Sequence, residues 1–166
     1  MEIILDRINL LPKQQFHDMV KSKQFNVGSK ITFSRTIHER EIILFAELTG
    51  DYSPNHVDEE FMKNSFYGNR IAHGALLVGY MSTASSMIIE KYAVEEHDVT
   101  PVSLGYDRIR FIKPVFINDT ITITYTVEQY DPVLQRASSN IEITNQLNEI
   151  VAVAKHILKW VLNTPK

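Results

Sequence analysis

The residue types best suited to acid–base chemistry gather in one short stretch, where Asp51 and His56 stand five residues apart. Pro54 lies between them, and a turn around this proline can bring the carboxylate and the imidazole into the same small volume. Such a pair can hold one water molecule, with one group accepting a proton and the other donating one. The stretch therefore predicts an acid–base site.

A second group of candidates stands where a long apolar segment begins, at His73 and Gly74. The first N–H groups of a helix lack intrahelical acceptors and carry the positive end of its dipole. A glycine lets a ligand oxygen approach them, so we expect an oxyanion site at Gly74. His73 belongs to the same substrate-binding region, more as a structural histidine than as a second base. Ser82 is expected to hydrogen-bond the acid–base pair, although a packing role stays open.

The elements that position these residues follow from hydrophobic periodicity. Residues 75–91 predict a helix that is small or apolar all round, and such a helix is normally buried on most sides. A curved sheet is the natural cover. Alternating apolar and polar residues predict strands over 31–37, 102–112 (with a phase switch near Asp107), 120–127, 136–144 and 150–162. Together these elements imply an α+β domain with a mostly antiparallel sheet.

The remaining segments connect these elements. A short helix is expected over 42–49, and residues 51–72 form a long connection without a periodic run. Long connections in compact domains are usually functional or disordered. Residues 1–26 are interpreted as an N-terminal extension packed on the domain, with a short helix over 14–20. The 166 residues therefore predict a single domain.

Composition excludes several classes of protein. The net charge is −3 and no basic run exceeds two residues, so a nucleic-acid partner is not expected. The chain has no cysteine, which excludes disulfides and thiol catalysis. The N-terminus does not read as a signal peptide, and residues 75–89 are too short to span a bilayer, so we expect a cytoplasmic protein. The spacing of Asp51, His56 and His73 matches no familiar zinc pattern, so neither a metal nor a cofactor is expected.

The two motifs together resemble a known signature. Residues 48–58 followed by 72–77 are similar to the hydratase motif of MaoC-like proteins, the (R)-specific enoyl-CoA hydratases, and residues 108–120 are similar to that family's strand–turn–strand. The resemblance implies a hot-dog fold, in which a curved antiparallel sheet wraps a long central helix. It also implies a homodimer or a higher homo-oligomer, with active sites near the dimer interface.

The resemblance also assigns roles by position. Asp51 and His56 match the family's catalytic pair, Gly74 matches the backbone donor to the thioester carbonyl, and Ser82 matches a supporting hydroxyl near the aspartate. One departure stands inside the motif, because Ser53 occupies the place where the family usually has asparagine. That change puts the acyl substrate in doubt, and not the catalytic pair.

The expected activity is hydration of trans-2-enoyl thioesters to (R)-3-hydroxyacyl thioesters, or the reverse dehydration. The substrate would be carried on coenzyme A or on acyl carrier protein. Arg108 and Arg110 are two apart on a predicted strand, so they are expected to share a face. They can bind coenzyme A phosphates or simply be solvated. Two other functions stay open, an acyl-thioesterase and a non-catalytic acyl-CoA-binding protein.

Overall fold

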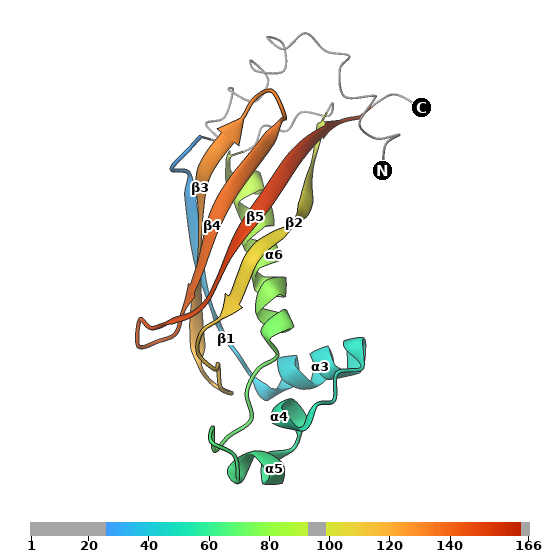
Figure 1. Cartoon of the computed structure of the whole chain (residues 1–166), viewed down its shortest axis with the longest axis vertical. Helices are drawn as coiled ribbons and strands as arrows, with labels where there is room; N and C mark the ends of the chain where they lie inside the picture. The colour runs from blue at the N-terminus through green and yellow to red at the C-terminus, as the bar shows by residue number, and fades with distance from the viewer. Residues whose placement is uncertain (1–25, 93–98, 164–166) are drawn as a thin grey trace.

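The described part of the chain forms one antiparallel sheet with a long helix on one face (Figure 1). The structure is a computed structural model that describes residues 26–92 and 99–163. Neighbouring strands of the sheet are all antiparallel, in the order β1-β3-β4-β5-β2. The strands are β1 (Lys30–Thr36), β2 (Val99–Phe111), β3 (Thr120–Asp131), β4 (Arg136–Thr144) and β5 (Ile150–Leu162).

Helix α6 (Gly74–Tyr92) packs its apolar stripe against the sheet. The buried positions recur at helical spacing and face the buried, alternating isoleucines of β3. These helix positions are Leu77, Met81, Ala84, Ser85 and Ile88. The prediction that the helix is buried on most sides is wrong for this chain alone. Its opposite face, with Gly79, Ser82 and Thr83, is exposed.

Three short helices gather at the end of the sheet where α6 begins (Figure 1). Helix α3 (Glu39–Thr49) contains the predicted helix and ends at Gly50, whose φ of 79° is left-handed. The connection over 51–72 is not free of regular structure, because it holds α4 (Pro54–Val57) and α5 (Glu59–Lys63). Pro54 occupies the first turn of α4, and the Asp58 side chain caps α5, in helices too short to show a period.

The predicted strands are present with small changes at their ends. The phase switch near Asp107 is a register shift between Asp107 and Arg110, with Arg108 at a left-handed φ of 54°. Simple alternation therefore does not place Arg108 and Arg110 on one face. The predicted extension over 1–26, with its helix over 14–20, lies outside the described residues except for residue 26. Within residues 26–92 and 99–163, no helix is long and apolar enough to cross a bilayer.

A polar group lies inside the core, on the face that α6 covers. His156 on β5 is fully buried, and its two ring nitrogens hydrogen-bond the Tyr125 hydroxyl and the Ser103 hydroxyl, each at 2.8 Å. Tyr106 stacks on the ring at 4.5 Å. Burial lowers the pKa of His156 from 6.5 to about 4. The ring is therefore neutral at neutral pH and acts as a core residue.

This buried histidine predicts how stability depends on pH. Below about pH 6.5 His156 binds a proton in the unfolded chain but stays neutral in the folded protein, so the free energy of unfolding falls as the pH drops towards 4. The two pKa values correspond to roughly 3 kcal/mol for this one group. We expect His156→Gln to lose most of that slope when urea unfolding is followed between pH 7 and pH 4.5. Equal slopes in the two proteins would contradict the prediction.

Candidate active site

Asp51 leaves the end of α3 with its carboxylate held by the next turn. The left-handed Gly50 ends the helix, and the Asp51 Oδ1 atom then accepts the Ser53 hydroxyl at 2.6 Å and the Ser53 N–H at 3.2 Å. These hydrogen bonds, the hydroxyl first, hold the pKa of Asp51 below its usual value. The side chain is thus an ionised, exposed proton acceptor at neutral pH.

His56 lies on α4 and is 8% exposed. Its Nδ1 atom is 2.8 Å from the Ile71 carbonyl oxygen, which can only accept, so Nδ1 carries the proton. The Nε2 atom is then the unprotonated nitrogen, and its lone pair accepts from the Asn55 side-chain amide at 3.1 Å. Burial lowers the pKa of His56, with the neighbouring His73 acting in the same direction. The resting ring is therefore neutral, with Nε2 as its acceptor.

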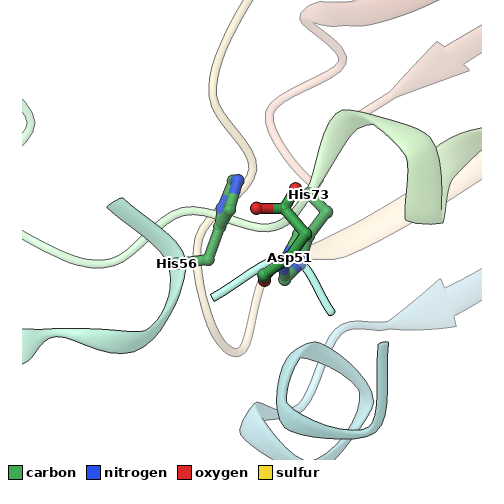
Figure 2. A group of neighbouring side chains, drawn as sticks. All are labelled: Asp51, His56 and His73. Carbon is green, nitrogen blue, oxygen red and sulfur yellow. The ribbon is translucent and has the colours of Figure 1, made fainter. Parts of the chain in front are cut away.

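His73, immediately before α6, lies beside Asp51 and His56 (Figure 2). Its Nε2–H donates to the Asp51 main-chain carbonyl at 3.0 Å, and its ring stacks on His56 with centroids 3.8 Å apart. One nitrogen from each ring and one Asp51 carboxylate oxygen lie within 4.8 Å of one another. His73 thus fixes the main chain of Asp51 beside the His56 ring, which is the structural role that the sequence favours.

A cavity of about 370 Å³ opens between His56 and the start of α6. Its walls include Gly74, Phe111 and Lys113. Gly74 is the first residue of α6, so its N–H has no acceptor within the helix. A Cβ atom at this position would lie 2.5 Å from the Phe111 ring, so a side chain there would displace the ring. Asp51, His56, His73 and Gly74 therefore meet at one end of α6, as the sequence predicts.

Ser82 is not brought to the acid–base pair within this chain. It lies eight residues after Gly74, roughly 12 Å along the helix axis. Its side chain is exposed on α6, whereas Ser53 supplies the hydroxyl on Asp51. The prediction that Ser82 hydrogen-bonds Asp51 or His56 is therefore wrong for the single chain. Ser53 takes that place because it follows Asp51 by only two residues in a tight turn.

Several site groups have no signal in the sequence. The Ile71 carbonyl fixes the His56 tautomer, but a main-chain oxygen is not marked by residue type. Phe111 covers Gly74 from a strand 37 residues away along the chain. Asn55 is not singled out by its residue type. Lys113 was visible only within the strand–turn–strand similarity, and its Nζ atom contacts Glu149 at the cavity edge.

The same three side chains do not form a good metal site as they stand. A tetrahedral zinc ion needs ligand lone pairs that converge on one point. The His56 and His73 rings are stacked with 27° between their planes and 3.8 Å between their centroids, so their in-plane lone pairs lie in two nearly parallel planes and do not readily meet at one point. One ring would have to rotate and lose its main-chain hydrogen bond before an ion could bind both. The arrangement suits proton transfer better than metal binding.

The fold has close counterparts among known proteins. The structure superposes on the (R)-hydratase of A. caviae with a TM-score of 0.73 at 23% identity, covering 83% of this chain and 98% of that one. It superposes equally well, at 0.73 and 31% identity, on a monoamine oxidase regulatory protein from Archaeoglobus, covering 85% and 93%. A hot-dog-like protein of Thermanaerovibrio acidaminovorans gives 0.60 at 14% identity, covering 84% and 85%. The fold is therefore the α+β hot-dog fold.

Sequence comparison identifies the family. The MaoC like domain matches residues 22–149, so this chain belongs to the MaoC-like family. An (R)-specific enoyl-CoA hydratase from Rhodospirillum rubrum is 33% identical over 101 residues, which cover 60% of this chain and 64% of that protein. Protein MaoC of Klebsiella aerogenes is 32% identical over 112 residues, covering 66% and 31%. The chain thus spans less than two thirds of the length of these two relatives.

Ser53 gives a direct test of the site's electrostatics. We expect Ser53→Ala to raise the pKa of Asp51 towards its ordinary value, because the shorter of its two hydrogen bonds is lost. Ser53→Asn is the matched control, since an amide N–H can donate to the same oxygen. Titration of the Asp51 carboxyl carbon by NMR measures both. An unchanged pKa in Ser53→Ala would show that the serine does not hold the carboxylate.

Proposed function

We propose that the chain is a hydro-lyase that converts trans-2-enoyl thioesters into (R)-3-hydroxyacyl thioesters, or catalyses the reverse dehydration. The observation that carries the proposal is the meeting of two proton acceptors with a helix start. Asp51 is ionised, His56 is neutral with Nε2 as an acceptor, and both lie beside the amino end of α6 at Gly74. Addition of water to an activated double bond needs these two functions together.

The geometry supports a simple sequence of steps. The Gly74 N–H donates to the thioester carbonyl, and the oxygen is stabilised as negative charge builds on it. A water that takes the place of the Asn55 amide at His56 Nε2, and is also held by Asp51, then attacks C3, forming the C–O bond. Both groups are unprotonated at rest, so the proton that reaches C2 is one taken from this water. Water is thus added across the double bond, and the protein ends in its starting state.

The substrate is placed in the cavity between His56 and α6. A volume of about 370 Å³ is within the usual range for small-molecule sites. Relatives of this chain are named for both kinds of carrier, a 3-hydroxybutyryl-CoA dehydratase and a mitochondrial 3-hydroxyacyl-[acyl-carrier-protein] dehydratase. The proposal therefore names an acyl thioester of coenzyme A or acyl carrier protein as the substrate. No nucleic acid, membrane, metal or cofactor enters it.

We also propose that two copies pair as a homodimer. Strand β2 is an edge of the sheet, with 13 residues and no described neighbour on its outer side. Leu104 and Phe111 on this strand are exposed, as is the small-residue face of α6 around Gly79. A long exposed edge is normally covered in a native protein. A cytoplasmic location stays a prediction from the sequence.

The activity is tested with crotonyl-CoA. The proposal predicts loss of the ultraviolet absorbance of the enoyl thioester without release of free thiol, and a product of R configuration at C3. Release of thiol would identify an acyl-thioesterase. Binding of crotonyl-CoA and of 3-hydroxybutyryl-CoA without turnover of either would identify a non-catalytic binding protein.

The catalytic pair is tested in the same assay. We expect Asp51→Asn and His56→Ala each to lower turnover by about 10²–10⁴-fold, because each removes a group that acts on the water's protons. Circular dichroism checks that both variants are folded. Tyr67→Phe is a matched control at the cavity wall, expected to keep its turnover within about threefold because no proton transfer depends on it. Near-full activity in both folded variants would show that Asp51 and His56 are not the catalytic pair.

A further inference from the structure

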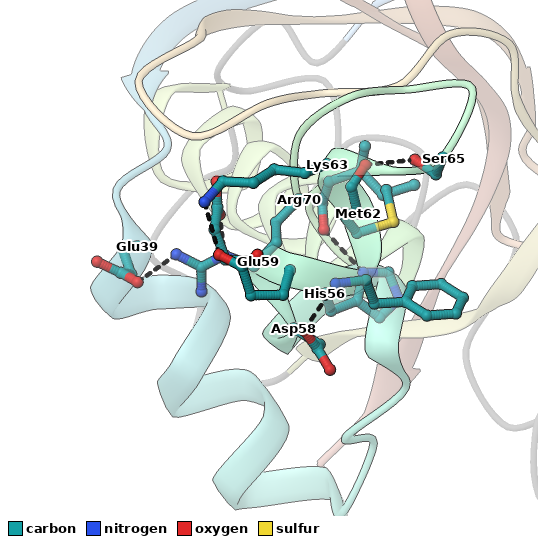
Figure 3. Close-up of polar contacts among 11 residues, drawn as sticks. Glu39, His56, Asp58, Glu59, Met62, Lys63, Ser65 and Arg70 are labelled. Carbon is teal, nitrogen blue, oxygen red and sulfur yellow. Dashed lines mark hydrogen bonds and ion pairs between the residues drawn. The ribbon is translucent and has the colours of Figure 1, made fainter.

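Residue Arg70 joins three separate parts of the site region. Its side chain is only 11% exposed and lies between two helices (Figure 3). The Nε atom is 2.9 Å from a Glu59 carboxylate oxygen, and the Nη2 atom pairs with Glu39. Glu39 is the first residue of α3 and Glu59 is the first residue of α5. The planar guanidinium thus ties the starts of both helices to the segment just before α6.

That segment carries the main-chain group on which His56 depends. The Ile71 carbonyl accepts the His56 Nδ1–H at 2.8 Å, and the Ile71 N–H donates to the Asn55 carbonyl at 3.0 Å. The next N–H, of Ala72, donates to the Val115 carbonyl at 2.8 Å. Residue 71 forms only an isolated bridge, with Phe116, so no continuous ladder fixes it. The position of the Ile71 carbonyl therefore depends on a few local contacts. The ion pairs of the preceding residue, Arg70, are among them.

We propose that Arg70 is a positioning residue of the acid–base site, which holds the Ile71 carbonyl and thereby the tautomer and orientation of the His56 ring. Arg70 does not touch the cavity that holds the proposed substrate. Its effect passes through the adjacent peptide, because its ion pairs with Glu39 and Glu59 stop the 70–72 segment from moving away from α4. The kinetic consequence of this inference rests on the proposed hydro-lyase activity, but the structural consequence does not.

The first readout is the His56 ring itself. In ¹⁵N-histidine-labelled protein, the wild type should show His56 as a single tautomer with the proton on Nδ1, and His56→Ala identifies its signals. We expect Arg70→Met to average the His56 signals between two tautomers. Arg70→Lys should give an intermediate result, because one ammonium group cannot reproduce the two separate donor positions of the planar guanidinium. This measurement needs no substrate.

The second readout is kinetic. We expect Arg70→Met to lower kcat by about ten- to a hundredfold while KM stays within about twofold, because a misplaced base loses rate more than binding. The acid limb of the kcat/KM profile should move to lower pH, since the hydrogen bond to Ile71 raises the pKa of His56. Asp51 and His73, the other titratable groups that face this ring, are unchanged in the variant.

A matched ion pair supplies the control. Arg35 on β1 pairs with Glu41 on α3 at 2.8 Å, away from the Ile71 segment. Arg35→Met is expected to lower the melting temperature without altering the His56 tautomer or the acid limb. If Arg70→Met behaves like Arg35→Met, losing stability alone, the positioning role is overturned. If Arg70→Met does not fold, Glu59→Gln removes one partner of Arg70 instead, and an unchanged His56 tautomer and acid limb in that variant would overturn the role equally.

The two proposals fail in different ways. If the wild-type protein does not hydrate crotonyl-CoA, but the His56 tautomer changes in Arg70→Met, the proposed activity is wrong and the positioning role stands. A wild-type protein that hydrates crotonyl-CoA, with an unchanged His56 ring in Arg70→Met, would do the reverse.

Discussion

A single hydrogen bond, from the His56 Nδ1–H to the Ile71 carbonyl, decides what the site can do. Because the carbonyl can only accept, this bond places the lone pair of the ring on Nε2, where the Asn55 amide donates to it. Burial keeps the ring neutral, and Ser53 keeps the Asp51 carboxylate ionised. Two different acceptors thus stand ready at one point. Without that bond the imidazole could turn, and the pair would no longer face one water.

The sheet and α6 position the third group of the site, the Gly74 N–H at the start of the helix. The buried stripe of α6, from Leu77 to Ile88, packs on the sheet and sets where the helix begins. Gly74 therefore stands beside His56, and the Phe111 ring lies over it at a distance that leaves no room for a Cβ atom. A helix start gives a fixed partial charge without a buried ion, which avoids the cost of desolvating a charged side chain. The fold thus supplies the electrophilic side of the site, and the 51–72 segment supplies the acid–base side.

Much of this arrangement was predictable, for physical reasons that differ between parts. The strands over 136–144 and 150–162, and the long helix, follow from periodicity because one face of each is buried. The convergence of Asp51, His56 and Gly74 was predicted from residue types and motif resemblance. The helices α4 and α5 were missed because four and five residues show no period. The position of Ser82 was predicted wrongly because a residue eight positions after Gly74 can share its helix face and still lie too far along the helix axis to reach Asp51. Arg70 was missed because its ion-pair partners are distant in sequence.

The account rests on Asp51, His56 and Gly74 acting on one acyl group. The most direct measurement is a crystal structure of the protein with 3-hydroxybutyryl-CoA bound. The account predicts that the thioester oxygen lies within hydrogen-bond distance of the Gly74 N–H. It also predicts that the 3-hydroxyl lies between the Asp51 carboxylate and the Nε2 atom of His56. An acyl group bound elsewhere, or a 3-hydroxyl that points away from both side chains, would contradict it.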